Sequence, residues 1–187
     1  MAGAVLRRRH GPAHSRLDCR SRRVPPGRRT YKLFAKYWSQ VTDPNDPRAT
    51  RLNGLPKYVV STTLDRVQWS NSILLRGDVA EEVAKLKRQP GGELQVHGSA
   101  TLIGTLMKHD LVDEYRILIH PVVLGNGKRL FGDGTTPTAL ELIDTKTTSR
   151  GVVAHIYQPS GKPEYGSVAL KQEDDVVKDS VSRQAPT

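Results

Sequence analysis

Apolar residues recur along the 187-residue chain at two spacings, every second position in some segments and every third or fourth position in others. The first spacing, or a short β-branched run, is typical of strands, and the second is typical of helices. Strands that alternate with helices predict an α/β fold with a mostly parallel central sheet, and residues 139–159 add an antiparallel C-terminal hairpin. The expected strands are 57–62, 73–75, 93–98 and 113–124, and the expected helices are 30–38, 47–52, 79–89 and 99–109.

Polar residues mark where two of these helices begin. Asp78 is placed to cap the helix 79–89, and Thr30 is the expected N-cap of the helix 30–38. Helical spacing predicts that one face of the helix 30–38 packs against the core. That face consists of Leu33, Phe34, Tyr37 and Trp38.

The two ends of the chain show neither spacing. Residues 1–26 are predicted to be an Arg-rich, disordered or aberrant arm, and residues 171–187 a flexible polar tail. The segment 27–170 between them is the expected single domain, and it is long enough to bury a core of its own.

Most of the net charge of +10 belongs to the arm. Nine arginines and one aspartate give the first 30 residues a charge of +8, which leaves +2 for the rest of the chain. The arm has no aromatic residues for base stacking and matches no nucleic-acid module, so we do not expect nucleic-acid binding. An organellar targeting peptide is also Arg-rich, but the prolines and glycines here do not suit an amphipathic helix.

Composition disfavours several other classes of protein. No apolar run reaches the roughly 18 residues of a membrane helix, and no apolar secretory leader is recognisable, so we expect a cytoplasmic protein without membrane contact. Cys19 is the single cysteine, which excludes an intramolecular disulfide and a Cys-rich metal site. The histidines lack the spacing of metal ligands, so no metal is expected.

Three junctions, each directly after a strand or at the start of a helix, have a composition suited to phosphate. The first N–H groups of a helix have no intrahelical acceptor and carry a positive partial charge, glycine permits close backbone approach, and arginine adds a bidentate donor. In a parallel α/β sheet the ligand crevice lies beyond the carboxyl ends of the strands. The junctions Gly27-Arg28-Arg29-Thr30, Ser61-Thr62-Thr63-Leu64 and His97-Gly98-Ser99 therefore predict a crevice for a phosphorylated cofactor.

Each junction also has a purely structural interpretation. Gly98-Ser99 is compatible with an ordinary helix cap, and Arg28-Arg29 with the end of the solvated arginine run. Ser61-Thr62-Thr63 has a composition that is common in turns. His97, on an apolar strand, is compatible with a structural or a catalytic histidine. The residues alone leave these alternatives open.

Four segments occur in a fixed order between Gly27 and Pro159: GRRTYKLFAKYW, LPKYVVSTTL, GGELQVHGSATLIGTLMKHDLVDEYRILIHPVVLGNGKRLF and GVVAHIYQP. Together they resemble the bacterial dihydrofolate-reductase-like family, and more closely its branch related to the reductase domain of bifunctional riboflavin biosynthesis proteins. The resemblance implies a three-layer dihydrofolate-reductase-like fold. It also implies hydride transfer from NADPH to a small pteridine-, pyrimidine- or carbonyl-type substrate.

The resemblance also implies which residues contact the cofactor. In the family, a Gly-Arg-x-Thr motif lies on the phosphate side, a Ser-Arg-Thr-Leu turn lies near the adenosine ribose phosphate, and a glycine turn with its helix start lies along the diphosphate and nicotinamide. It assigns no catalytic residue. The matching positions in this chain are Gly27, Arg28, Thr30, Ser61, Thr62, Thr63, Gly98, Ser99, Thr101 and Leu102.

The chain departs from the family pattern at two places. Thr62 stands where the family turn has arginine, which removes a bidentate partner for a 2′-phosphate and leaves the choice between NADPH and NADH open. Residues 1–26 contain no counterpart of the family's first apolar strand, as a shifted reading frame or a mis-assigned start would produce. We therefore expect that strand to be missing, its neighbours to be unpaired, and stability and activity to be impaired.

The resulting hypothesis is an NADPH-dependent reductase, with NADH not excluded. The alternative is a non-catalytic nucleotide-binding or dimerising protein of the same fold. Residues 113–124 and the GNGKRLF loop resemble family regions near subunit contacts, so we also expect a homodimer.

Overall fold

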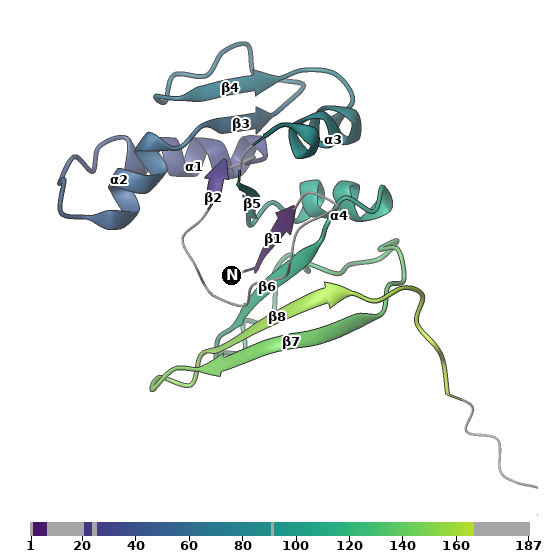
Figure 1. Cartoon of the computed structure of the whole chain (residues 1–187). Coiled ribbons are helices and arrows are strands. Elements are labelled where there is room, and N and C mark those ends of the chain that lie inside the picture. Colours follow the sequence, from purple (N-terminus) through teal and green to yellow (C-terminus); the bar gives the residue numbers. More distant parts are fainter. Residues whose placement is uncertain (1, 7–20, 24–25, 91, 167–187) are drawn as a thin grey trace, which may run out of the picture.

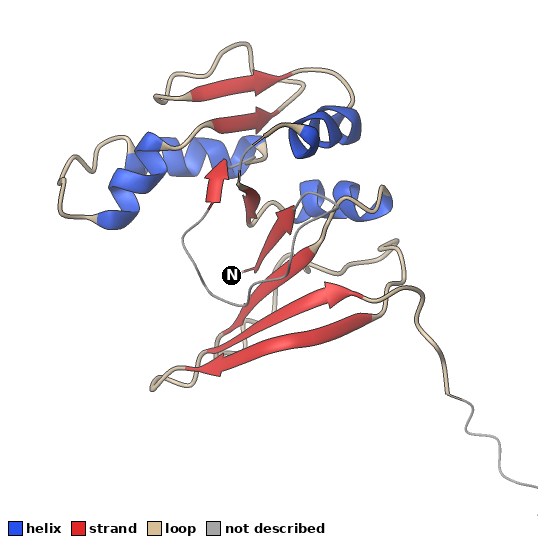
Figure 2. Cartoon of the chain, in the orientation of Figure 1, coloured by secondary structure: helices blue, strands red, loops and turns tan. Residues whose placement is uncertain are grey.

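The computed structural model describes residues 2–6, 21–23, 26–90 and 92–166. These residues form a mixed α/β fold, whose helices and strands are distinguished in Figure 2. The helices are α1 (Arg28–Trp38), α2 (Pro47–Gly54), α3 (Val79–Arg88) and α4 (Ala100–Lys108). The strands are β1 (Ala2–Leu6), β2 (Ser21–Arg23), β3 (Lys57–Val60), β4 (Ser72–Leu75), β5 (Glu93–His97), β6 (Glu114–Ile119), β7 (Leu140–Thr147) and β8 (Val153–Pro159).

The strands of the described residues form one large sheet and one small sheet. The large sheet has six strands in the order β2-β5-β1-β6-β8-β7, and the small sheet pairs β3 with β4. An isolated bridge between Gly27 and Val60 joins the segment that follows β2 to β3. Figure 1 shows β3 and β4 at one end of the molecule and β7 and β8 at the other.

The prediction of a mostly parallel central sheet is wrong. Among the strands that the structure describes, β2 with β5 and β3 with β4 pair in parallel, whereas β1 is antiparallel to both β5 and β6. β6, β8 and β7 then pair in antiparallel fashion, which confirms the C-terminal hairpin. The difference arises because the direction of a strand depends on its non-local partners, which the local apolar pattern does not contain.

The expected absence of a first strand is also wrong. Ala2–Leu6 lies in the middle of the large sheet, where Ala4, Val5 and Leu6 are each only 1% exposed. Both β5 and β6 are therefore paired along β1, and burial of Val5 and Leu6 stabilises the fold by roughly 1.5–3 kcal/mol each. A five-residue apolar run next to many arginines gives too weak a signal, but it fills an otherwise open position between two strands.

The predicted arm at 1–26 therefore includes two strands of the sheet, β1 and β2. Residues 1, 7–20 and 24–25 of that segment lie outside the described residues, as does the predicted tail 171–187. The division of the chain into arm, domain and tail stays a prediction beyond those two strands.

Two hydrophobic cores lie on opposite sides of β3, so the helices form layers on both sides of the strands. Val59 packs with Tyr31 of α1 and with Trp69, while its neighbours Tyr58 and Val60 pack against the larger core. Successive residues of a strand point to opposite faces, so the two cores must be on different faces. The larger core contains the apolar sides of α3 and α4.

The predicted buried face of helix α1 is confirmed only in part: Phe34 and Trp38 pack against the smaller core beside Tyr31, whereas Leu33 and Tyr37 do not. Tyr31 is 5% exposed, and its hydroxyl accepts hydrogen bonds from the backbone N–H groups of Gln68 and Trp69, both at 3.0 Å. Leu33 and Tyr37 are 71% and 62% exposed. The helix also begins at Arg28, earlier than expected, with Gly27 rather than Thr30 at the N-cap position. A helix of this length has several apolar stripes, and packing selects among them.

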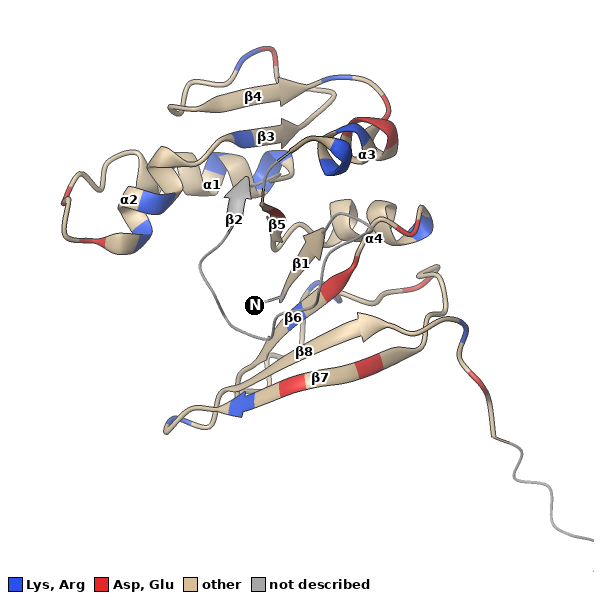
Figure 3. Ribbon diagram, viewed as in Figure 1, with Lys and Arg blue, Asp and Glu red and all other residues tan. Residues whose placement is uncertain are grey.

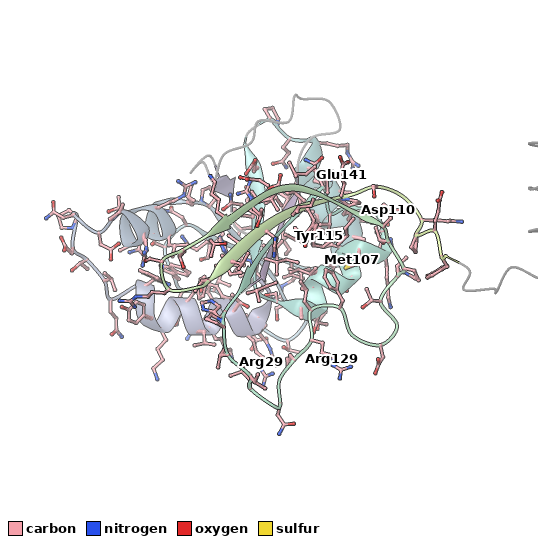
Figure 4. All side chains as sticks on the ribbon, turned by 90° about the horizontal axis from the view of Figure 1, so that it is seen from below. Arg29, Met107, Asp110, Tyr115, Arg129 and Glu141 are labelled. Carbon is pink, nitrogen blue, oxygen red and sulfur yellow. The ribbon has the colours of Figure 1, made fainter. Side chains whose placement is uncertain are left out.

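The C-terminal end of α4 packs near the start of β6. Figure 4 shows Met107, Asp110 and Tyr115 close together there. Burial, followed by the negative charge of Asp110, raises the pKa of Tyr115 to about 12. β6 ends at Ile119, before the predicted end at 124. Among the helices that the structure describes, none is long and apolar enough to cross a membrane.

Candidate functional site

The three predicted junctions lie together although they are far apart in the sequence. The backbone N–H of Gly27 donates to Ser99 Oγ at 3.1 Å, and the hydroxyls of Thr30 and Ser99 are 2.7 Å apart. Arg28 Nη1 donates to Thr63 Oγ1 at 2.9 Å, which joins the start of α1 to the turn after β3. The starts of α1 and α4 and the turn at 61–64 therefore form one continuous surface.

Ser99 does not cap its own helix. It occupies the N-cap position of α4 in a left-handed conformation, with φ 57° and ψ 55°, and its side chain caps no N–H of that helix. A left-handed conformation costs a non-glycine residue on the order of 1 kcal/mol. The hydrogen bonds to Gly27 and Thr30 hold it there. The side chain thus links two helices, and the first N–H groups of α4 remain uncapped by Ser99.

Two glycines permit this close approach. A Cβ atom at Gly27 would lie 3.1 Å from Ser99 Oγ, closer than ordinary contacts allow. Gly98 has φ +59°, a conformation that side chains rarely adopt. Substitution at Gly27 would therefore push the starts of α1 and α4 apart, whereas substitution at Gly98 would strain the backbone of the turn.

Positive charge surrounds the start of α1. Its first turn contains Arg28 and Arg29, it contains no acidic residue, and no side chain caps it. Both arginines are exposed. Cations near the positive end of a helix are unfavourable by several tenths of a kcal/mol, so this arrangement is suited to an anionic ligand.

The turn after β3 is held in shape by its own hydrogen bonds. Ser61 Oγ accepts from the backbone N–H groups of Thr63 at 3.2 Å and Leu64 at 3.1 Å. Arg76 Nη2 donates to the carbonyl oxygen of Asp65 at 2.8 Å, which anchors the loop that follows. Thr62 and Thr63 are exposed, so both present hydroxyls at the surface.

The structure separates the last two predicted residues. Thr101 is exposed in the first turn of α4, whereas Leu102 is 6% exposed and belongs to the larger core. Leu102 can therefore face a ligand only through its backbone.

The half of the described chain that carries α1, α2 and α3 is basic. Residues 26–90 contain twelve Lys and Arg against six Asp and Glu, whereas residues 92–166 contain seven against eight. Figure 3 shows the blue segments on α1, α2 and α3 and the red segments on β7. A field of this sign attracts a polyanion toward the three junctions.

A cavity of about 150 Å³ lies over one face of the large sheet, where residues of β1, β5, β6 and β8 line it, next to the start of α4. His97, which directly precedes Gly98, and Arg116 of β6 are among its lining residues. Burial, and then the positive charges of Arg116 and Arg51, lower the pKa of His97. His97 is therefore neutral at neutral pH and able to both donate and accept a hydrogen bond.

Arg116 is a functional candidate that the sequence pattern did not reveal. Its Nε donates to Glu114 Oε1 at 2.6 Å, and its Nη2 lies 3.3 Å from Glu93 Oε2. Only the register of β1 with its neighbours brings Arg116 and His97 to the same cavity, so no local signal could have found the pair. No group of three or more potential metal ligands occurs among the residues the structure places.

Comparison with known proteins places the chain in a family. The sequence pattern of the RibD C-terminal domain matches residues 26–154. The chain belongs to this family. The match begins within one residue of the predicted start at Gly27, and its end lies in β8.

The chain is also similar to two relatives in sequence and to a solved structure in fold. The chain is 37% identical over 137 residues to YyaP of Bacillus subtilis (strain 168), an uncharacterized protein. This match covers 72% of the present chain and 72% of YyaP. It is also 34% identical over 98 residues to YwjB of the same organism, another uncharacterized protein. This match covers 52% of the present chain and 56% of YwjB. A crystal structure from Shewanella sp. PV-4, of a protein whose name connects it with riboflavin biosynthesis, has a TM-score of 0.61 at 23% identity. That match covers 80% of this chain and 84% of the other, and it shows the fold.

Proposed function

We propose that this RibD C-terminal domain protein is an NADPH-dependent reductase that transfers hydride to a small pteridine-, pyrimidine- or carbonyl-type substrate. The observation that carries the proposal is the meeting of the starts of α1 and α4, neither of which has a side-chain cap. With a single cysteine the chain has no evident need of an oxidising compartment, so the proposal includes a cytoplasmic location.

The residues present fit a dinucleotide phosphate. The N–H groups at the starts of α1 and α4 would hold the diphosphate, with Gly27 and Gly98 permitting close approach. Thr62 and Thr63 offer exposed hydroxyls for the adenosine ribose phosphate, and Ser61 holds their turn in shape. When bound, NADPH supplies the hydride, while the chain positions the cofactor and excludes competing orientations.

Arg28 replaces the arginine that the turn at residue 62 lacks. Its guanidinium reaches from α1 to Thr63, next to Thr62, so a bidentate donor is present at the turn although it comes from another element. We therefore propose that Arg28 contacts the 2′-phosphate and that the protein prefers NADPH to NADH.

Fluorescence titration with NADPH and NADH tests the cofactor assignment. Substitution Arg28→Met should weaken NADPH binding by roughly tenfold or more, and NADH binding much less, because NADH lacks the 2′-phosphate. Arg48→Met is the matched control, since Arg48 is an exposed arginine in the first turn of α2. A wild-type protein that binds neither cofactor would refute the proposal.

A homodimer is part of the proposal. Val122, Val123 and Leu124 are consecutive apolar residues with exposed fractions of 61%, 95% and 78%. Apolar side chains in such a run favour burial against another surface. Sedimentation velocity should show a dimer for the wild type and a monomer for Val123→Glu. A monomeric wild type at tens of micromolar would contradict this part alone.

A further inference from the structure

Strand β1 places a glycine between two polar side chains of neighbouring strands. Gly3 pairs with His97 on β5 and with Arg116 on β6. Paired residues point to the same face of a sheet, so His97 and Arg116 flank the position where Gly3 has no side chain. Their Cα atoms are two strand spacings apart, about 10 Å.

The space above Gly3 is the cavity of about 150 Å³. By their register, Leu118 and Ala154 face the same side as Arg116 and add apolar walls. An engineered apolar cavity of about 150 Å³ in another protein holds one benzene molecule. The volume above Gly3 therefore matches a single six-membered ring.

The polar groups of the cavity are held in defined positions. Glu114 and Glu93 each bind one nitrogen of Arg116, which fixes the guanidinium plane and offsets its charge. A guanidinium has five N–H donors, so donors remain for a ligand oxygen. A neutral carbonyl suits this compensated arginine better than an anion does. On the other side, His97 offers a neutral imidazole.

We infer that this cavity recognises the substrate, with His97 and Arg116 binding opposite edges of one uncharged, carbonyl-bearing six-membered ring that lies over Gly3. That the bound ring is the substrate rests on the proposed function, because the ring would lie beside the start of α4, where the cofactor is proposed to bind. The inference also gives the N-terminal strand a role in the site, since Gly3, which lacks a side chain, is one of the residues that line the cavity.

Ligand-observed NMR on the full chain without cofactor tests the cavity. We expect 2-pyridone to bind at millimolar concentration and the fused ring of 2-quinolone to bind at least about threefold more weakly. Gly3→Val and Ala154→Leu fill the cavity from different strands and should each abolish binding of 2-pyridone. Gly127→Val is the matched control, because a Cβ there meets no atom within 4 Å, and it should leave binding unchanged.

A second variant separates recognition from a structural role of Arg116. Arg116→Lys keeps the charge beside the two glutamates but loses the planar donor group. It should weaken 2-pyridone binding by about fivefold to tenfold while leaving fluorobenzene, which has no carbonyl, unaffected. An equal loss for both ligands would overturn the recognition role.

The outcomes distinguish this inference from the proposed function. Circular dichroism checks that each variant is folded, and Ala154→Leu serves if a side chain at residue 3 disturbs β1, where a Cβ would lie 3.1 Å from the carbonyl oxygen of Val96. Unchanged 2-pyridone binding in a folded cavity-filling variant, or no binding to the wild type, overturns the inference. Failure of the wild type to bind NADPH, with 2-pyridone binding lost in the filled variants, refutes the reductase proposal and supports the pocket.

Discussion

The four helices in the described part of the chain begin in two contrasting ways. Asp46 accepts hydrogen bonds from two backbone N–H groups at the start of α2, at 2.8 and 3.1 Å, and Asp78 accepts one at the start of α3, at 2.9 Å. The starts of α1 and α4 have no such cap, and they meet through Gly27 and Ser99. Carboxylates thus cap the starts of α2 and α3, whereas the uncapped starts of α1 and α4 converge near Arg28 and Arg29.

Helix α2 is closed at its other end as well. Lys57 is 1% exposed, and its Nζ donates to the carbonyl oxygens of Leu55 at 2.7 Å, Leu52 at 2.8 Å and Asn53 at 3.2 Å. The same ammonium lies 4.4 Å from the centre of the Trp69 ring. This region therefore uses its charges for stability, whereas the region around Arg28 keeps them exposed.

The largest expected effect of a single change on stability is at Lys57. Substitution Lys57→Met leaves the last carbonyls of α2 without their buried donor, so we expect a loss of about 2–4 kcal/mol in the free energy of unfolding. Urea denaturation measures it. At a temperature where the variant is folded, its NADPH affinity should stay within about twofold of the wild-type value. A larger change would remove the contrast between the region around Lys57 and the region around Arg28.

The pH dependence of stability, compared between the wild type and Lys57→Met, gives a second test. Burial lowers the pKa of Lys57 to about 8 from the 10.5 of an unfolded chain, so between these values the unfolded state binds more protons. The stability of the wild type relative to Lys57→Met should therefore rise from pH 8 to pH 10.5. A flat difference between the two urea midpoints would show that the ammonium keeps its ordinary pKa.

The caps of α2 and α3 should each contribute a smaller amount. Asp46→Ala and Asp78→Ala remove a carboxylate from a helix start, at a cost of about 1 kcal/mol each. Because neither residue lies at the three junctions, cofactor binding should not change. Thermal unfolding and NADPH titration of the same samples check both statements.

A charge reversal at the uncapped start of α1 should have opposite effects on stability and on NADPH binding. Arg29→Glu puts an acid in the first turn of α1, which should stabilise the helix by about 0.3–1 kcal/mol. It should also weaken NADPH binding by about tenfold through repulsion of the phosphates. Arg48→Glu, in the first turn of α2, is the control for stability without an effect on binding. Loss of stability in Arg29→Glu would mean that the arginine serves the fold.

The smallest expected effect is the acid sensitivity of His97. Its pKa in the folded protein is below the usual 6.5, because of burial and then of Arg116 and Arg51, so the unfolded state binds more protons below pH 6.5. Relative to His97→Gln, the wild type should lose stability as the pH falls from 6.5 to 5. An equal loss of stability in both proteins over this pH range would place His97 in contact with solvent.

Much of the local structure could be predicted because it depends on neighbouring residues. Asp78 caps α3 as expected, since the capping carboxylate lies within one turn of the N–H that it binds. The three junctions were recognised from composition and family resemblance, and hydrogen bonds such as that between Thr30 and Ser99 show them in one place. Ser99 itself was misjudged as a possible cap, because its left-handed backbone depends on a partner 72 residues away.

The sequence by itself determined the helices, most of the strands, the basic charge around α1 and the residues gathered at the phosphate-suited junctions. The tertiary structure alone decided the direction of the strands, the place of Ala2–Leu6 in the sheet and the pairing of His97 with Arg116 across Gly3. The physical reason is range: capping and periodicity act within one or two turns, whereas strand pairing is a competition among distant segments for the same hydrogen-bonding edges.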